Sequence, residues 1–364
     1  MAGQQAQPAR RLIVTLVNSG RSFEAAAEES LLDAAQSAAL NLPRSCGSGN
    51  CGACKARLLR GEIHYPNGAP LGLAAGETAE GLILMCQARA LTDLSLETFD
   101  VQTADQARRK RLPCRIERAV PLSHDVMGLF LRLPIAEDFT FEPGQYIDVL
   151  LPGGRRRSFS IASPPHDARP LELHVRRVIG GEFTDRLFHE DTRSSLLTIE
   201  GPLGQFTYRR HAAVPLSAAP PPMLLIAGGT GIAPILSILR HVIENGIERD
   251  MRLFWGARSE ADLYAHTTLE ALSRRASSLR YSPVLSEAPS GWRGLTGWVH
   301  EAAFAGVDNL ESYEVYAAGP PAMIAAIRAG YAARGNVTDR LYYDSFDYAP
   351  DTLERQRMSA AIRS

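Results

Sequence analysis

Four cysteines in a fixed spacing constrain this chain more than any other feature. Cys46, Cys51 and Cys54 follow a C-x4-C-x2-C pattern, and Cys86 comes after a further gap of 31 residues. This spacing is typical of a [2Fe-2S] site, in which one short loop supplies three thiolates and a distant segment supplies the fourth. Such a cluster carries electrons singly, so the pattern predicts a chain that transfers electrons.

Other interpretations of these cysteines fit less well. Four of the five cysteines in 364 residues fall into one ligand pattern, which is unlike the disulfide framework of a small secreted protein. Zinc favours paired C-x2-C knuckles, and only one such pair occurs here. A Rieske centre needs two histidine ligands, which the loop lacks. Zinc and buried structural thiols stay open as alternatives.

The glycines of the loop agree with a cluster. Gly47, Gly49 and Gly52 would let the backbone pass close to inorganic sulfide and offer it N–H groups, which bulky residues prevent. Cys114 lies outside the pattern, and we expect it to be a small buried hydrophobic residue.

Charge and hydropathy limit the partners of the chain. With 39 basic and 40 acidic residues the net charge is −1, so no overall field attracts nucleic acid or anionic lipid. No apolar run approaches the roughly 18 to 20 residues that cross a bilayer, and no signal-peptide core is evident. We therefore expect a soluble, cytoplasmic protein with neither nucleic-acid nor membrane partners. The basic run 108–111 is predicted to be a solvated linker.

A chain of this length is expected to form two or three domains. Residues 11–100 predict a small α+β domain that carries the cysteine loop. Its hairpin is expected at 12–25, and its helix at 30–40, where apolar residues recur at helical spacing before Pro43. Two further strands are expected at 55–59 and 94–99.

A polar linker at 101–112 leads to a second domain at 113–217. Short β-prone segments, separated by Pro and Gly, predict an antiparallel β-barrel there. The six strands are expected at 114–120, 126–133, 146–151, 158–162, 171–178 and 195–200.

A proline-rich joint at 218–222 precedes a third domain at 223–346. Apolar strands alternate there with helical stretches, which predicts a parallel, helix-flanked α/β sheet. The chain is thus expected to be multidomain, α+β followed by α/β, with an unstructured tail at 347–364.

Two motifs in the second domain suit a nucleotide-like cofactor. Arg157, Phe159 and Ser160 lie on one predicted strand. Gly181 and Thr184 lie at a predicted helix start, whose unpaired N–H groups and dipole favour phosphate. A further turn is expected at Gly201-Pro202-Leu203-Gly204.

The third domain has its own phosphate seat. Gly228, Gly229, Thr230 and Gly231 follow a strand and precede a helix, although they form neither G-x-G-x-x-G nor a Walker loop. A second turn at Gly319-Pro320 is expected to close the far side of that site.

These motifs together resemble the ferredoxin–NADP reductase superfamily, and residues 11–100 resemble a plant-type ferredoxin. The resemblance implies an FAD whose pyrophosphate is bound by Arg157, whose ring is stacked by Phe159, and whose N5 lies near Ser160. It also implies that Gly181 and Thr184 hold phosphate and that His174 and Val175 line the ring. The family more often has tyrosine at position 159.

In the third domain the same resemblance places the nicotinamide nucleotide on the two glycine turns. Ala318 stands where the family usually has cysteine, which puts the hydride-transfer geometry in doubt. The segment 342–346 resembles the terminal segment that brings an aromatic residue, here Phe346, toward the flavin; an edge strand with a buried Phe346 is the alternative. Glu260 and Asp262 favour NADH over NADPH, whereas Arg258 argues for NADPH.

The domain order resembles the reductase components of bacterial multicomponent oxygenases and also the CDP-6-deoxyglucoseen reductases. It implies NADH-dependent electron transfer through FAD and a [2Fe-2S] cluster to an oxygenase or ferredoxin-like acceptor protein. The alternatives are a reductase that serves a sugar-nucleotide dehydrase and a redox sensor without turnover.

Overall fold

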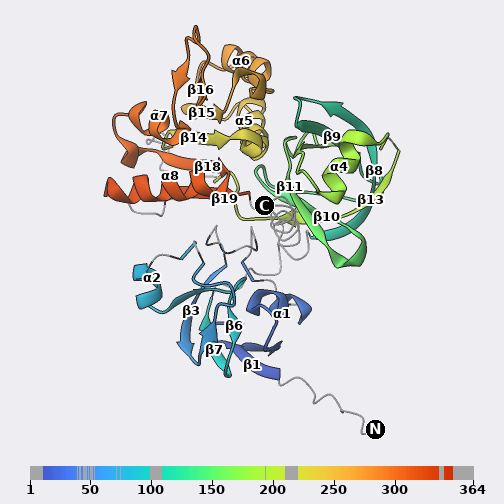
Figure 1. Cartoon of the computed structure of the whole chain (residues 1–364), viewed down its shortest axis with the longest axis vertical. Helices are drawn as coiled ribbons and strands as arrows, with labels where there is room; N and C mark the ends of the chain where they lie inside the picture. Colours follow the sequence, from blue (N-terminus) through green and yellow to red (C-terminus); the bar gives the residue numbers. More distant parts are fainter. Residues whose placement is uncertain are drawn as a thin grey trace, which may run out of the picture. The chain divides into compact units, whose positions relative to one another are not determined.

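The computed structural model divides the chain into two compact units, Met1–Ala107 and Arg108–Ser364 (Figure 1). None of the helices it describes is both long and apolar enough to cross a membrane. The described residues are 11–38, 40, 42–43, 47, 49, 52, 54–70, 72–73, 75–98, 109–192, 194–209, 220–335 and 340–346.

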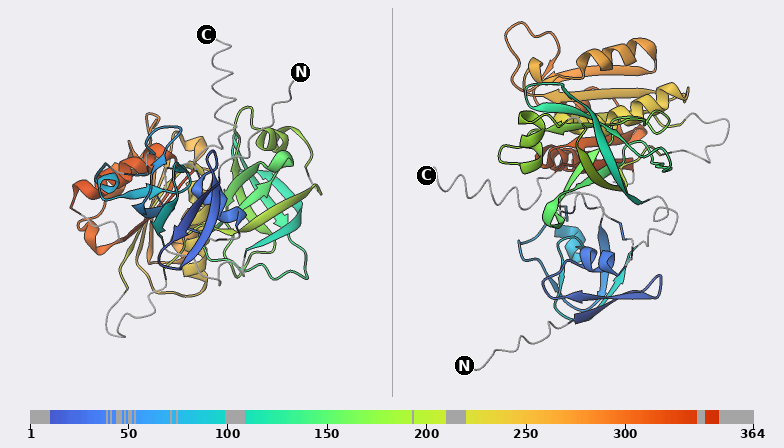
Figure 2. Two further views of the ribbon diagram at one scale, coloured as in Figure 1. Left: turned by 90° about the horizontal axis from the view of Figure 1, so that it is seen from below. Right: turned by 90° about the vertical axis from the view of Figure 1, so that its right-hand side faces the viewer.

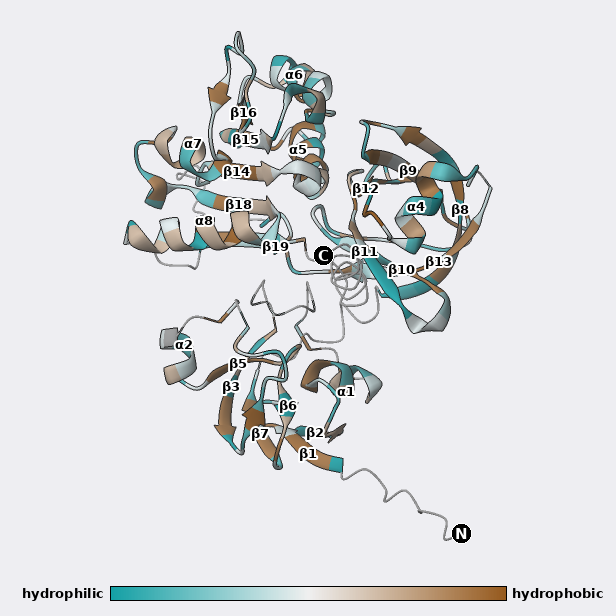
Figure 3. Cartoon of the chain, viewed as in Figure 1, coloured by the Kyte–Doolittle hydropathy of each residue, from teal (hydrophilic) through white to brown (hydrophobic). Residues whose placement is uncertain are grey.

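The first unit is built on a five-stranded mixed sheet in the order β2-β1-β7-β3-β5. The predicted hairpin is confirmed, because β1 and β2 pair antiparallel, while β7 runs parallel to β1. Figure 3 shows hydrophobic residues along β1 and β7, and the buried ones face the core of this unit: Leu12, Val14, Leu16, Leu94 and Leu96. The elements are β1 (Arg11–Leu16), β2 (Arg21–Ala26), α1 (Leu31–Ser37), β3 (Lys55–Arg60), β4 (Ile63–His64), α2 (Ala75–Ala79), β5 (Leu82–Leu84), β6 (Arg89–Ala90) and β7 (Leu94–Glu97).

Helix α1 starts where the sequence predicts but ends earlier. Ser30 is its N-cap, and the Ser30 hydroxyl accepts a hydrogen bond from the Asp33 N–H at 3.0 Å. The helix ends at Ser37 instead of Leu40, because the Leu40 N–H turns back to the Ala35 carbonyl at 2.8 Å. Leu40 is thereby buried in the core of the first unit.

The second unit contains a six-stranded sheet in which every pair is antiparallel, as the sequence predicts. Its order is β11-β10-β13-β8-β9-β12, and a single antiparallel bridge joins Ile161, just after β11, to Leu173 of β12. Closure into a full barrel stays a prediction. The strands are β8 (Lys110–Pro121), β9 (Val126–Arg132), β10 (Tyr146–Leu150), β11 (Arg156–Ser160), β12 (Leu171–Arg176) and β13 (Leu196–Leu203); helix α4 is Glu182–His189.

Two boundaries of this sheet differ from the sequence prediction. Strand β8 begins at Lys110, inside the predicted linker, and Lys110 pairs with Glu137 at 3.1 Å. Strand β13 continues through Leu203, so the expected turn at 201–204 is a strand end that turns at Gly204, where φ is +97°. In both places the residues pair with a neighbouring strand, and this pairing overrides the tendency of the local sequence to form a turn or a linker.

The rest of the second unit is a parallel sheet in the order β17-β16-β15-β14-β18-β19, as predicted. Helices lie on both faces: α5 and α6 pack on one side, and α7 and α8 pack on the other (Figure 2). The elements are β14 (Met223–Gly228), α5 (Ile232–Glu244), β15 (Met251–Ala257), α6 (His266–Arg275), β16 (Leu279–Leu285), β17 (Leu295–Thr296), α7 (Val299–Ala305), β18 (Glu314–Gly319), α8 (Pro321–Ala333) and β19 (Leu341–Ser345), with short 3-10 turns at Pro152–Gly154, Gly229–Gly231, Glu260–Asp262 and Leu310–Ser312.

The amino end of the parallel sheet contains a buried ion pair. Arg249 Nη2 lies 2.6 Å from Glu314 Oε2, and the two side chains are 1% and 3% exposed. The Tyr316 hydroxyl donates to Glu314 at 3.5 Å, and Arg249 donates to the Tyr208 hydroxyl at 3.5 Å. This end of the sheet is therefore closed by a desolvated polar cluster.

Candidate functional site

Two of the four predicted cluster ligands lie among the described residues. Cys54 precedes β3 and Cys86 follows β5, and both side chains are buried. The Cys86 backbone N–H donates to Cys54 Sγ at 3.4 Å. A hydrogen bond of this kind stabilises negative charge on sulfur, as a cluster thiolate requires. Cys46 and Cys51 lie outside the described residues.

Among the described residues of the cysteine loop, Gly49 has little room for a side chain, whereas a Cβ at Gly47 would meet nothing within 4 Å. Gly49 has a φ of +85°, and a Cβ built there would lie 2.7 Å from Gln87 Cγ and 3.0 Å from Pro70 Cβ. Gln87 Nε2 also donates to the Gly47 carbonyl at 2.9 Å. A tight glycine loop beside two buried thiols fits a bound cluster, whose sulfides need close contact with the main chain.

Tyr65 also belongs to this region, and the sequence offered no signal for it. The Tyr65 hydroxyl accepts from the Leu84 N–H at 3.0 Å. Burial raises the pKa of Tyr65, and the negative charges of the Cys54 and Cys86 thiolates raise it further, against the hydrogen bond from Leu84. The group is therefore a neutral phenol close to the Cys54 and Cys86 sulfurs.

Strand β11 presents the first predicted cofactor residues. Because side chains alternate along a strand, Arg157 and Phe159 share one face, while Ser158 faces the other and donates to Asp148 at 2.6 Å. The Phe159 ring packs against Phe183 with centroids 5.6 Å apart. Ser160 ends the strand and is 8% exposed.

The contact between Phe159 and Phe183 joins β11 to the start of α4, so the structure brings together two motifs that the sequence separates. Gly181 is the N-cap of α4. The Thr184 hydroxyl accepts from the Val178 N–H at 3.1 Å, so it holds the turn itself. Asp185, in the first turn of α4, is paired with Arg177 at 2.9 Å, which offsets its charge near the phosphate seat that the sequence predicts.

The His174 ring makes two contacts with protein groups. Its Nε2 lies 3.0 Å from Glu172 Oε1 and its Nδ1 lies 3.1 Å from the Tyr264 hydroxyl. Both ring nitrogens therefore contact protein groups between the two sheets of the second unit, and the role of His174 in lining the flavin ring stays a prediction. The neighbouring Val175 is fully buried.

The two glycine turns of the parallel sheet lie against each other. Gly228 ends β14, and a Cβ there would lie 2.6 Å from Met323 Sδ. A Cβ at Gly231 would lie 2.0 Å from the Ala318 carbonyl oxygen, and one at Gly319 would lie 3.1 Å from the Gly228 nitrogen. The described backbone thus leaves no room for side chains at the carboxyl end of the sheet, where open α/β sheets bind nucleotides.

The flanking residues of these turns agree with that placement. Thr230 lies in the short 3-10 turn Gly229–Gly231, and the Gly229 carbonyl accepts from Trp255 Nε1 at 2.9 Å. Pro320 is the N-cap of helix α8. Ala318 is fully buried in β18, so the substitution of the usual cysteine leaves this strand packed.

Phe346 follows an edge strand, which was one of the two interpretations of its segment. Strand β19 pairs parallel with β18, so that Gly319 lies opposite Ser345. The Phe346 N–H donates to the Gly319 carbonyl at 2.9 Å, and the side chain is half-buried. The edge strand thus positions Phe346 at the second glycine turn.

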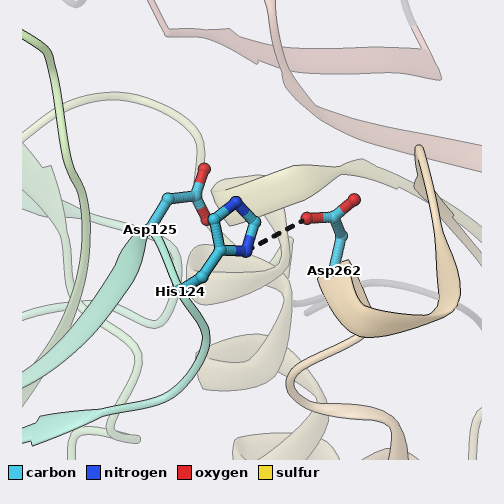
Figure 4. A group of neighbouring side chains, drawn as sticks. All are labelled: His124, Asp125 and Asp262. Atoms are coloured by element: carbon cyan, nitrogen blue, oxygen red, sulfur yellow. Dashed lines mark ion pairs between the residues drawn. The ribbon is translucent and has the colours of Figure 1, made fainter.

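His124, Asp125 and Asp262 gather between the two sheets of the second unit (Figure 4). The three groups offer ligand atoms within 4.8 Å of one another, and His124 Nδ1 lies 3.8 Å from Asp262 Oδ1. However, Asp125 accepts from the Ser123 hydroxyl and lies 3.3 Å from Arg176 Nε. A neighbouring guanidinium disfavours a bound cation, so this arrangement is better described as a contact between the two sheets.

Asp262 has a structural role that the sequence did not show. It accepts from the Ser259 N–H at 3.0 Å and from the Ser259 hydroxyl at 2.8 Å, forming a capping box after β15. Burial opposes ionisation of Asp262, but the hydrogen bonds from Ser259 outweigh it and lower the pKa of the carboxyl.

A cavity of about 500 Å³ in the described part of the second unit lies elsewhere, and none of the predicted site residues lines it. It is lined by Thr140, Phe141, Glu142, Pro143, Pro165, Thr207, Tyr208, Arg209 and His241.

Comparison with protein families gives three matches in sequence order. The 2Fe-2S iron-sulfur cluster binding domain matches residues 14–91, the oxidoreductase FAD-binding domain matches residues 113–208, and the oxidoreductase NAD-binding domain matches residues 225–329. The second and third matches cover the two sheets of the second unit.

Curated relatives align along nearly the whole chain. The CDP-6-deoxy-L-threo-D-glycero-4-hexulose-3-dehydrase reductase of Yersinia pestis is 33% identical over 92% of this chain and 98% of that protein. Reductase component 2 of terephthalate 1,2-dioxygenase from Comamonas sp. is 32% identical over 90% of this chain and 95% of that protein. Among solved structures, the Amycolatopsis cytochrome P450 reductase superimposes with a TM-score of 0.71 at 32% identity, over 92% of this chain and 98% of that one.

Proposed function

The chain belongs to the family of NAD(P)H-dependent iron–sulfur flavoprotein reductases, and from this premise we propose that it is the NADH-dependent reductase component of an oxygenase system. One observation carries the proposal: the three cofactor-binding domains occur in one chain, in the order of relatives that are themselves reductase components. Its partner would be a terminal oxygenase or a ferredoxin-like acceptor protein.

The cofactors supply the redox chemistry when bound, since a flavin accepts two electrons from a nicotinamide and passes them singly to an iron–sulfur cluster. The chain supplies binding and position. Arg157 would pair with the FAD pyrophosphate by charge-assisted hydrogen bonds, and Phe159, supported by Phe183, would cover the ring. Ser160, buried at the end of β11, would lie near the reactive edge of the ring.

The remaining binding roles are assigned to residues at the two helix starts and at the glycine turns. Gly181 and Thr184 would shape the turn that receives the flavin phosphates, and His174 and Val175 would line the flavin ring. The nicotinamide nucleotide would lie on the carboxyl end of the parallel sheet, and Phe346 would cover the flavin from that side. The nucleotide-binding residues are Gly228, Gly229, Thr230, Gly231, Gly319 and Pro320.

Preference for NADH follows from charge near the end of β15. Glu260 and Asp262 would repel the 2′-phosphate of NADPH. Because Asp262 is held in the capping box with Ser259, we assign it this electrostatic effect and assign the ribose contact to Glu260.

The proposed domains are 11–100, 113–217 and 223–346, with the linker at 101–112 and a tail at 347–364. The six-stranded sheet of the middle domain would be a closed barrel, and the bridge between Ile161 and Leu173 supports this closure. The four cluster ligands would be Cys46, Cys51, Cys54 and Cys86.

The experiment that tests this function uses variants to distinguish the role of the flavin from that of the cluster. Anaerobic NADH should bleach the flavin absorbance of the wild-type protein, and cytochrome c should then be reduced. Cys51→Ser should abolish cytochrome c reduction but retain reduction of dyes that take electrons from flavin. Cys114→Ala, which changes a buried cysteine outside the ligand pattern, should leave both activities intact.

Two results would contradict the proposal. If neither NADH nor NADPH bleaches bound flavin, the chain is a redox sensor or binding module without turnover. If Cys51→Ser removes dye reduction as well, the flavin and the cluster do not act in series.

A second candidate acceptor has support from the curated relatives. The 3-dehydrase reductase of Yersinia pestis matches this chain over 98% of its own length. The alternative function is therefore electron supply to a sugar-nucleotide dehydrase. Reconstituted turnover with a dehydrase and with an oxygenase component, each with NADH, would decide between the two acceptors.

A further inference from the structure

Glu172 lies in a polar contact between the two sheets of the second unit. We call the antiparallel sheet, which carries the proposed FAD-binding residues, the flavin sheet, and the parallel sheet the nucleotide sheet. It is on β12, and its carboxylate accepts from Arg240 Nη1 of helix α5 at 2.5 Å. The other carboxylate oxygen lies 3.0 Å from His174 Nε2. The Glu172 side chain is 16% exposed, so both contacts form in a largely desolvated position.

The partners of Glu172 keep its carboxylate ionised. Burial disfavours the carboxylate, but the hydrogen bond with His174 and the charge and hydrogen bond of Arg240 outweigh it and lower the pKa of Glu172 to about 2. Glu172 is therefore ionised across the range in which an enzyme of this kind is assayed.

One route leads from Glu172 to the flavin strand and to helix α5. The Glu172 carbonyl accepts from the Ala162 N–H at 2.7 Å, two residues beyond Ser160. Arg240 also donates to the Ala162 carbonyl at 3.3 Å, and Ser237 of α5 donates to the Ser163 carbonyl at 2.8 Å. Helix α5 begins at the glycine turn of the nucleotide site, so this route joins the flavin strand to that turn.

A second route reaches the same glycine turn from its other side. The His174 ring lies edge-on to Tyr264, with centroids 5.3 Å apart, and Tyr264 lies edge-on to Trp255 at the same centroid distance. Trp255 Nε1 then donates to the Gly229 carbonyl at 2.9 Å. The two routes diverge at Glu172 and converge on the turn at 229–231.

We propose that Glu172 is a positioning residue that fixes the nucleotide turn relative to the flavin strand, and thereby sets the rate of electron entry from NADH. This inference rests on the proposed function. Glu172 acts through Arg240 and His174 and touches neither cofactor, so it should affect the geometry of transfer more than the binding of either cofactor. Small misplacements of reacting groups are costly, since about 1 Å can change a rate by roughly 100-fold.

The test uses Glu172→Gln, which keeps the shape of the side chain and removes its charge. The full-length protein with bound FAD is mixed with NADH anaerobically, and the rate of flavin bleaching is followed across NADH concentrations. The limiting rate should fall by about tenfold or more, whereas the half-saturating NADH concentration should stay within about twofold. FAD content and cluster reduction by photochemically reduced flavin should not change.

Glu117→Gln is the matched control. Glu117 of β8 pairs with Arg132 of β9 at 2.7 Å, so Glu117→Gln removes an ion pair of similar length that is more exposed and does not bridge the two sheets. Its limiting rate should equal that of the wild type.

An unchanged limiting rate in Glu172→Gln overturns the inference, and so does loss of FAD or a change confined to the half-saturating concentration. If Glu172→Gln does not yield folded protein, the test uses Tyr264→Phe, which removes only the hydroxyl beside His174. The limiting rate of this variant should fall while its half-saturating NADH concentration stays within about twofold. If Tyr264→Phe does not show this pattern, the inference is also overturned. Failure of the wild-type protein to bleach with NADH or NADPH would instead reject the proposed function.

Discussion

The two ends of the parallel sheet differ in how they are packed. At the amino end, Arg249 and Glu314 are buried as a pair, and side chains fill the space between strands. At the carboxyl end, glycines such as Gly228 and Gly231 leave no side-chain volume, and backbone packs on backbone. The first end can contribute to stability because nothing has to enter it. The second brings two backbone turns close together at the edge where open α/β sheets bind nucleotides.

The largest effect on stability is expected at the amino end. Glu314→Gln leaves the Arg249 guanidinium buried without its counter-charge, which should lower the free energy of unfolding by about 3–5 kcal/mol. Urea unfolding followed by circular dichroism measures this loss. Flavin reduction per folded molecule should not change, because the pair lies at the end of the sheet opposite the glycine turns. An equal loss in Glu117→Gln, whose pair is more exposed, would show that burial does not make the difference.

A smaller loss of stability with a larger loss of function is expected at the carboxyl end. Gly231→Ala would place a methyl group 2.0 Å from the Ala318 carbonyl oxygen, which should cost about 1–3 kcal/mol and displace the nucleotide turn. The NADH concentration that half-saturates flavin reduction should rise. The control is Gly246→Ala: no atom lies within 4 Å of its Cβ, although its φ of +63° makes alanine strained. If both variants bind NADH equally, crowding at the turn does not matter.

The smallest effect is expected at Asp262, just beyond β15. Asp262→Asn keeps an oxygen for the capping box but removes the charge, so the loss should be below about 1 kcal/mol at neutral pH. Because the folded protein lowers the pKa of Asp262, the carboxylate stabilises the fold above the usual aspartate pKa, and this contribution disappears as the pH falls through the lowered value. Thermal unfolding curves of the two proteins should therefore converge in acid. Asp308→Asn, at an exposed position, is the control and should change the free energy of unfolding little at neutral pH.

The sequence predicted well those structural features that depend on residues close together in the chain. Short β-prone segments between Pro and Gly located the strands of the antiparallel sheet, and apolar segments alternating with helical stretches indicated the parallel sheet, although the short β17 was missed. The glycine turns were identifiable because they lie between a strand and a helix. The Ser30 cap was the expected start of helix α1. Helix α7 was missed, since it has only seven residues and no side-chain cap.

What the sequence could not predict depends on contacts between distant segments. Glu172 and Arg240 are 68 residues apart, and Arg249 and Glu314 are 65 apart. A charged residue on a strand usually faces solvent, so nothing local distinguishes these from ordinary surface charges. The contacts of the His174 ring with Glu172 and Tyr264 likewise join distant segments, and the sequence did not predict them. The roles of the predicted site residues, His174 included, stay predictions.

The mutual packing of the two glycine turns has a consequence for how this domain can change. A Cβ at Gly228 or at Gly319 would meet the same Met323 side chain, at 2.6 Å from its sulfur and 2.7 Å from its methyl group. A larger residue at one position must therefore be accompanied by a smaller one at position 323. Variants of the two glycine turns should therefore change positions 228, 319 and 323 together.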